Sequence, residues 1–255
     1  MSNKLKILLE LEDLNGKTPT EINLILGTIY EYARELNALK ELSKGIDISS
    51  SINLQNFTDD DKMTFYYNLS NAWSYKKMMI QTLNSPEFWE FENEELIQEI
   101  INCRKALLFS KNTENRDRKC EILTNLGNDL SHLGRVSEAI DCWKRALEIK
   151  EDFPMAIGNL GFGLFHYAQI LYDDSHRAYF LKESYKFLRQ AVNSPNIYPE
   201  AQNSFSRIVS IIEQKVNNSF LNSTNNFANY ALGKSLLEQK YRRWCNLTHL
   251  RHTQK

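Results

Sequence analysis

The stretch NLGNDLSHLGRVSEAIDCWKRALEIK, residues 125–150, decides the fold of this chain. Apolar residues recur in both of its halves at steps of three and four, which is the period of one helix face. Gly134 interrupts that pattern, at a point where a tight turn needs a residue that tolerates a positive φ. The stretch therefore predicts two helices joined by a turn. The triplet Asn-Leu-Gly that begins at Asn125 returns at Asn159, 34 residues later, which indicates a structural repeat.

Small residues, Gly127, Ala139 and Ala146, mark the places where the two predicted helices come close together. This hairpin resembles the tetratricopeptide repeat (TPR), a family built from 34-residue helical hairpins. Glu151 stands where the family usually ends a repeat with Pro, and Pro154 follows three residues later. The other positions agree with the family's first-helix Leu-Gly, its turn, and the Ala, aromatic and Ala of its second helix, which here are Leu126, Gly127, Leu130, Gly134, Arg135, Ala139, Trp143 and Ala146.

Weaker copies of the hairpin lie on both sides. Upstream, residues 65–73 have Ser70 in place of the glycine, residues 96–111 supply a return helix, and a long insert over 76–95 separates them. Downstream, Asn159 opens a repeat whose return helix is predicted over 180–192, followed by an amphipathic helix over 198–216. The N-terminal part has a capping-type start at Thr18-Pro19 and a polar connection over 47–61.

We therefore predict an all-α protein, an α-solenoid of about three TPR-like hairpins with helical N- and C-terminal extensions. The expected organisation has three parts. Residues 1–62 form a helical extension or a degenerate repeat, residues 63–216 form the TPR-like array, and residues 217–255 form an Asn/Ser-rich linker and a C-terminal helix. With only 9 Gly and 5 Pro, the chain has too few turn signals for a β-sandwich or barrel.

Composition limits the class of protein. The formal net charge is −1, so no global field attracts nucleic acid or membrane. The four cysteines form no C-x-x-C pair, which favours reduced thiols over disulfides or zinc. The N-terminus is not a signal peptide, and no run approaches the roughly 18 apolar residues of a membrane span. We expect a cytoplasmic protein without membrane contact.

Asparagine recurs at the repeat position just before the recurring Leu, and again three residues later. The TPR resemblance implies that first helices line a concave face that binds a protein or peptide segment, and side-chain amides can pair with both N–H and C=O groups of such a segment. The expected partner-binding residues are Asn68, Asn71, Asn125, Asn128, His132, Asn159, Phe162 and His166. The alternatives are that these asparagines bond neighbouring turns, that the histidines are ordinary surface residues, and that the aromatic residues are core.

The sequence contains no phosphate loop, dinucleotide fingerprint, nucleophile elbow or H-E-x-x-H motif. We therefore expect a non-enzymatic scaffold with no catalytic residue, no metal and no cofactor. The partner's identity and the oligomeric state stay open.

The C-terminal tail carries a second, shorter resemblance. Residues 241–245 are similar to the start of HEPN-type domains, which follow TPR arrays in some bacterial proteins and are often RNases with an Arg and a His four to six residues apart. Arg243 and His249 have that spacing. The resemblance implies an alternative function, the N-terminal sensor of a TPR–HEPN RNase of a defence or toxin system, in which RNA would be bound only through a missing catalytic domain.

Overall fold

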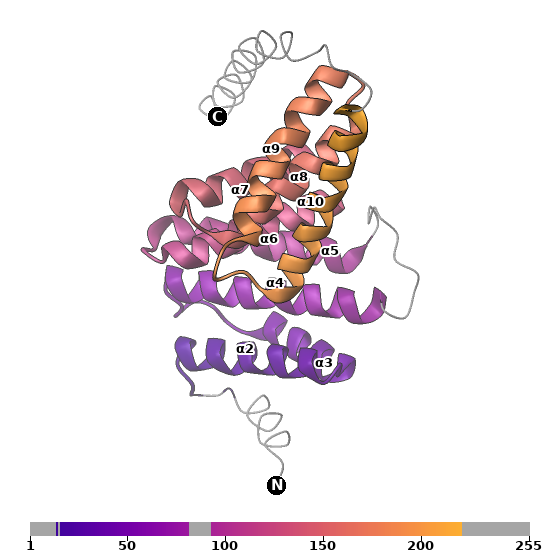
Figure 1. Ribbon diagram of the computed structural model, residues 1–255. Coiled ribbons are helices and arrows are strands. Elements are labelled where there is room, and N and C mark those ends of the chain that lie inside the picture. The colour runs from indigo at the N-terminus through magenta and orange to yellow at the C-terminus, as the bar shows by residue number, and fades with distance from the viewer. Residues whose placement is uncertain (1–13, 15, 82–92, 221–255) are drawn as a thin grey trace. The chain divides into compact units, whose positions relative to one another are not determined.

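The structure is a computed structural model that describes residues 14, 16–81 and 93–220 (Figure 1). The described residues form nine α-helices, one short 3₁₀ helix and no strand, so the prediction of an all-α, TPR-like helical repeat is confirmed. In chain order the elements are α2 (Pro19–Glu35), α3 (Leu39–Ser51), α4 (Asp59–Gln81), α5 (Glu94–Phe109), η1 (Ser110–Asn112), α6 (Arg116–His132), α7 (Val136–Ile149), α8 (Pro154–Ile170), α9 (Asp174–Val192) and α10 (Pro199–Phe220).

The chain divides into two compact units, Met1–Ala156 and Ile157–Lys255, and each is described here by itself. The first unit contains α2 to α7 and the first residues of α8, while the rest of α8 belongs to the second unit with α9 and α10. The expected boundaries of the array at residues 63 and 217 fall inside α4 and α10.

Three successive helical pairs build the first unit, α2 with α3, α4 with α5, and α6 with α7. Neighbouring pairs stack, because α2 and α3 pack against α4 while α5 packs against α6. Such stacking buries the apolar faces that a single hairpin leaves exposed, as in other helical arrays. The N-terminal part, which the sequence left as an extension or a degenerate repeat, contains the hairpin of α2 and α3, and both helices pack against α4.

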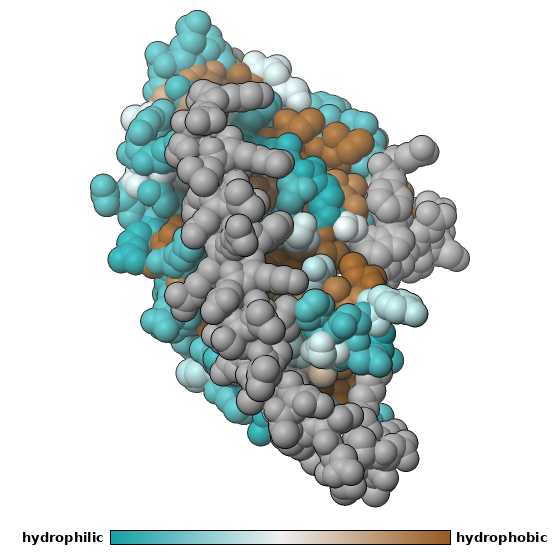
Figure 2. Space-filling view, turned by 90° about the horizontal axis from the view of Figure 1, so that it is seen from above, coloured by the Kyte–Doolittle hydropathy of each residue, from teal (hydrophilic) through white to brown (hydrophobic). Residues whose placement is uncertain are grey.

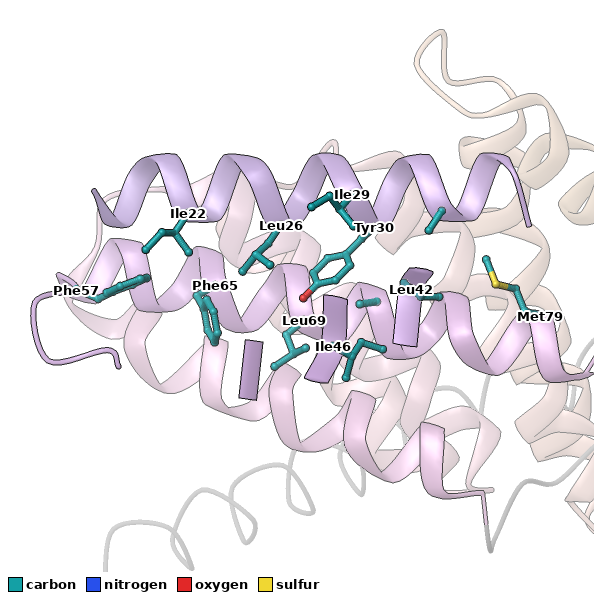
Figure 3. Packing of buried hydrophobic residues seen from close by; sticks show 12 residues of the cluster. Ile22, Leu26, Ile29, Tyr30, Leu42, Ile46, Phe57, Phe65, Leu69 and Met79 are labelled. Carbon is teal, nitrogen blue, oxygen red and sulfur yellow. The ribbon is translucent and has the colours of Figure 1, made fainter. Parts of the chain in front are cut away.

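The N-terminal hairpin is built on Tyr30 of α2. Its ring is 2% exposed, and it lies in the apolar core that α2, α3 and α4 share (Figure 3). Its hydroxyl pairs with Ser49 Oγ at 2.5 Å and donates to the Gly45 carbonyl at 3.4 Å. The polar connection predicted over 47–61 was wrong at both ends, because Ser49 is part of the core and α4 already begins at Asp59. Helix α3 continues to Ser51, and the connection covers residues 52–58.

Local signals set the start of α2. Thr18 is its N-cap, and a capping box joins the Thr18 hydroxyl to the Glu21 backbone and the Glu21 carboxylate to the Thr18 backbone. Pro19 follows at the first helical position, where its missing N–H costs nothing. This predicted helix start is confirmed.

The hairpin of α6 and α7 contains the quoted stretch. Gly134 has φ +71°, so the turn between the two helices needs the freedom that only glycine has without strain. A Cβ atom at Gly127 would lie 2.5 Å from Trp143 Nε1, and Ala139 and Ala146 are fully buried. The small residues are therefore the points of close approach that the repeat pattern predicts.

In the second unit, α8 packs closely on α9. A Cβ atom at Gly161 would meet the Leu188 backbone nitrogen at 2.9 Å, and Ser184 Oγ donates to the Gly161 carbonyl at 2.6 Å. The return helix was predicted over 180–192, but α9 begins at Asp174, because the Asp173 carboxylate caps it by accepting from the His176 N–H.

Three of the four cysteines lie within the described ranges. Cys103, Cys120 and Cys142 are buried thiols, as expected, while Cys245 and the predicted C-terminal helix lie outside the described residues. Within the described ranges, none of the helices has the length and apolar character needed to cross a membrane. The face seen in Figure 2 mixes apolar residues, in brown, with hydrophilic ones, in teal.

Candidate functional site

The first unit contains a groove of about 640 Å³, and its walls are made mainly by the first helices of the three hairpins. We call this cavity the groove. Helices α2, α4 and α6 supply sixteen of its lining residues and α5 supplies one. The lining consists of Gly27, Tyr30, Glu31, Tyr67, Asn68, Asn71, Ser74, Tyr75, Lys77, Met78, Glu99, Arg118, Glu121, Asn125, Asn128, Asp129 and His132.

Asparagine amides run along this lining from α4 to α6. Asn125 Nδ2 donates to Asn71 Oδ1 at 3.2 Å, so the two neighbouring first helices are joined by an amide pair. Asn68 Nδ2 donates to the Asn23 carbonyl of α2 at 3.1 Å. Because an amide has two donors and two acceptor positions, each of these bonds uses only part of the hydrogen-bonding capacity of the side chain.

Asn128 has a more specific structural contact. Trp143 Nε1 donates to Asn128 Oδ1 and to the Thr124 carbonyl, both at 3.2 Å. The indole ring is 1% exposed, so its N–H needs such partners. Asn128 therefore connects the groove to the packing of α7 against α6.

Tyrosines and ion-paired side chains also contribute to the lining of the groove. The Tyr75 hydroxyl donates to the Glu31 carboxylate, which also pairs with Arg34 at 2.9 Å. Burial raises the pKa of Tyr67 to about 12, and the nearby Glu121 carboxylate acts in the same direction. Arg118 lies 4.3 Å from the centre of the Tyr67 ring and pairs with Glu121 at 2.8 Å.

A buried charge cluster lies at the floor of the groove. Lys77 Nζ is 3.0 Å from Glu99 Oε2, and both side chains are 7% exposed. Asp129 is 2% exposed and interacts electrostatically with both of them. Burial first, and the Glu99 carboxylate second, raise the pKa of Asp129 well above its usual range. The floor therefore holds two carboxyl groups beside one ammonium group.

The structure brings together five of the eight residues expected to bind a partner. Asn68, Asn71, Asn125, Asn128 and His132 all line the groove.

The other three expected residues, Asn159, Phe162 and His166, lie on α8 in the second unit. They are half-buried and recur at helical spacing, with the Phe162 and His166 ring centres 4.4 Å apart. Burial lowers the pKa of His166. Partner binding by all eight residues stays a prediction.

Sequence reasoning missed the charge cluster at the floor, although a signal for it exists. Asp129 follows Ile122 by seven residues, so both fall on one face of α6. Glu99 likewise lies between Leu96 and Cys103 at steps of three and four, inside an apolar stripe. Charged residues at apolar positions of neighbouring helices are the pattern that marks a buried ion network.

Within the described ranges, no group of three or more His, Cys, Asp or Glu side chains is arranged so that it could hold a metal ion. Arg243 and His249 lie outside the described residues, so the RNase alternative stays a prediction.

Comparison with known proteins agrees with the geometry of the α6–α7 hairpin. Residues 120–153 match the family model of the tetratricopeptide repeat. The chain contains a tetratricopeptide repeat. The matched residues cover most of α6, all of α7 and the turn after it, up to the residue before α8. The TPR is a protein-interaction module, and the first helix of the matched hairpin carries Asn125, Asn128 and His132, which line the groove. No curated protein gives a significant match to the chain.

Proposed function

We propose that the groove binds an extended segment of a partner protein, and that the chain is a non-enzymatic interaction scaffold. The observation that carries this proposal is the amide lining of Asn68, Asn71 and Asn125 across two adjacent hairpins. An extended segment exposes unpaired N–H and C=O groups along its backbone. Side-chain amides can satisfy both kinds, so they hold a backbone with little demand on its sequence.

The size and composition of the groove support the same occupant. About 640 Å³ is within the range of ordinary ligand sites and accommodates a short peptide segment. Tyr30, Tyr67 and Tyr75 add aromatic surface, which is enriched at protein interfaces. Helix α6, which forms one wall of the groove, belongs to a TPR. Because the TPR is a protein-interaction module, the ligand we propose is a protein.

A displayed library of random twelve-residue peptides, selected on the full chain, tests the proposal. Ser74 is half-buried and lines the groove, so Ser74→Trp fills it. Ile101 on α5 is 39% exposed and lies outside the lining, so Ile101→Trp is a control of equal bulk. We expect enriched peptides that bind the wild type and Ile101→Trp equally but bind Ser74→Trp at least tenfold more weakly.

The amides are tested separately with the same peptides. Asn125→Ala removes one member of the Asn71–Asn125 pair, and we expect the affinity to fall, with a loss of stability of about 1 kcal/mol for the one hydrogen bond between the hairpins. If the peptides bind Ser74→Trp as tightly as the wild type, the groove is not their binding site. If they bind Asn125→Ala as tightly as the wild type, the Asn125 amide is not part of that site.

A further inference from the structure

Met78 supplies exposed apolar surface to the lining of the groove. Its side chain is 56% exposed, whereas Met63 and Met79 on the same helix are 0% and 6% exposed. Two of the three lining tyrosines, Tyr30 and Tyr67, are buried. Methionine is flexible and polarizable, and it is enriched at protein interfaces. An apolar group of a ligand that covered Met78 would remove this surface from water.

Met78 lies at one end of the groove, because α4 and α6 run in the same direction beside each other. Three interactions between these helices follow the chain in the same order. They are Arg118 Cζ at 4.3 Å from the Tyr67 ring centre, Asn125 Nδ2 at 3.2 Å from Asn71 Oδ1, and the electrostatic interaction of Lys77 with Asp129. Met78 and His132, each seven residues beyond the amide pair, are the last lining residues of their helices.

The charged side chains of the lining already have partners within the protein. Asp129 is 2% exposed and is hydrogen-bonded to Glu99 and Cys103. The ion pairs are Arg118 with Glu121 at 2.8 Å, Lys77 with Glu99 at 3.0 Å, and Arg34 with Glu31 at 2.9 Å. A charged side chain of a ligand would have to compete with one of these pairs. An uncharged side chain is therefore the better match to this lining.

We propose that the bound segment carries one large apolar side chain, that of leucine, isoleucine, methionine or phenylalanine, and that this side chain packs on Met78. The inference rests on the proposed function, because it names a residue of the segment that the groove binds. The segment lies along α4, with its backbone at the Asn71–Asn125 pair and the apolar side chain beyond it. Seven residues of helix rise about 10.5 Å, which is the length of about three residues of an extended chain. The apolar residue therefore lies about three residues from the position whose backbone meets the amides.

The first arm of the test observes Met78 directly in the wild-type full chain, with the peptides selected on the groove. Binding should shift the ¹³C-methyl signal of Met78 and give nuclear Overhauser contacts from that methyl group to one apolar side chain of the peptide. The methyl groups of Met63 and Met79 are internal controls, because both side chains are buried, and they should show no such contacts. A Met78 methyl group without a peptide contact would overturn the inference. This arm requires no variant that has to fold.

The second arm measures the coupling between Met78 and the apolar residue. We expect a large apolar residue at one common position of the selected peptides, and about a tenfold loss of affinity when it becomes serine. On Met78→Gln, which keeps the length of the side chain and makes its end polar, the same change should cost less than threefold. Ile97→Gln is the matched control and should keep the tenfold loss, because Ile97 is 39% exposed and lies outside the lining. Equal losses on the wild type and Met78→Gln would show that the apolar side chain packs elsewhere.

The third arm tests the path of the segment along α4. Methylating one backbone nitrogen of the peptide at a time removes one N–H donor at a time. The greatest loss of affinity should occur about three residues from the apolar position, and Asn125→Ala should reduce that loss. A greatest loss next to the apolar residue would overturn the placement of the segment along α4.

The outcomes separate the two proposals. Peptides that bind Ser74→Trp more weakly than the wild type, but share no apolar position, would overturn the inference and leave the proposed function standing. If no peptide binds the groove, the proposed function is wrong and the inference falls with it.

Discussion

Gly127 of α6 and Trp143 of α7 lie so close that a Cβ atom at residue 127 would be 2.5 Å from the indole Nε1. The same indole N–H donates to Asn128 Oδ1 and the Thr124 carbonyl, at 3.2 Å each. The ring therefore fills the space that the missing side chain leaves. This one contact links the repeat pattern in the sequence, the packing of the hairpin and the wall of the groove.

We expect Gly127→Leu to lower the free energy of unfolding by about 1–3 kcal/mol, because a side chain at this position must displace the Trp143 ring. Urea unfolding followed by circular dichroism measures it. Ser137→Leu adds the same side chain at an exposed position of α7 and should change stability by no more than about 0.5 kcal/mol. Equal midpoints for the two variants would contradict the close packing of α6 on α7.

Asp129→Asn should become steadily more stable relative to the wild type as the pH rises from 5 to 8. The pKa of Asp129 is raised on folding, so above its unfolded value the native chain holds a proton that the unfolded chain has released. Wild-type stability then falls with pH, by up to about 1.4 kcal/mol per pH unit for one proton, until the folded pKa is passed. Asn keeps the shape of the side chain and does not titrate. Urea unfolding of both proteins at several pH values measures the difference.

The matched control for this pH dependence is Asp117→Asn. The Lys150 ammonium, which bonds Asp117 at 2.8 Å, lowers the pKa of that exposed carboxyl. Its contribution to stability is present above its unfolded pKa and is lost only as the pH falls through the folded value, so it should stay constant between pH 5 and 8. Parallel stability curves for wild type and Asp129→Asn would show that Asp129 is ionised in the native protein.

Tyr30→Phe should lower the free energy of unfolding by about 1–2 kcal/mol, because it removes the hydroxyl that pairs with buried Ser49 at 2.5 Å. Chemical unfolding measures the loss. Tyr32→Phe, at a half-buried position on the same helix, should have little effect. If both changes cost the same, α3 is not held against α2 through Ser49.

In the second unit, Gly158→Ala and Gly161→Ala should both lower the free energy of unfolding. A second substitution, in the side chain that the new Cβ meets, should restore stability to Gly158→Ala and not to Gly161→Ala. A Cβ atom at Gly158 would lie 2.0 Å from Cε2 of the Phe205 ring, whereas one at Gly161 would lie 2.9 Å from the Leu188 backbone nitrogen. A smaller side chain relieves the first clash, and no substitution at residue 188 moves a backbone atom. We therefore expect Phe205→Leu to cost less in the Gly158→Ala background than in the wild type, by a double-mutant cycle of unfolding free energies. If a smaller side chain at Leu188 restored the stability of Gly161→Ala in the same way, the close contact of α8 with the backbone of α9 would be contradicted.

The α6–α7 hairpin was predictable because its determinants are local. Helical periodicity, a glycine at φ +71° and small residues at the contact between the helices all leave marks in the sequence. The end of α3 was not predictable in the same way. Four of the five residues 47–51 are polar, yet all five are helical in the structure, where Ser49 bonds the Tyr30 hydroxyl from the neighbouring helix.

For the asparagines, too, one property was predictable from the sequence and another was not. Their repeat spacing predicted one shared face, and Asn68, Asn71, Asn125 and Asn128 all line the groove. Their bonds were not predictable, because Asn125 pairs with Asn71 of another hairpin and Asn128 accepts from Trp143 of the return helix. Part of their hydrogen-bonding capacity holds the array together, which spacing along one helix does not reveal.

The sequence by itself determined the helical class, the 34-residue repeat, its turn and its close contacts, because each of these depends on residues near one another in the chain. Only the tertiary structure decided that Lys77, Glu99 and Asp129 meet at the floor of one groove. They come from α4, α5 and α6, and the charge state of Asp129 depends on the burial and the neighbours that the stacking of those helices creates.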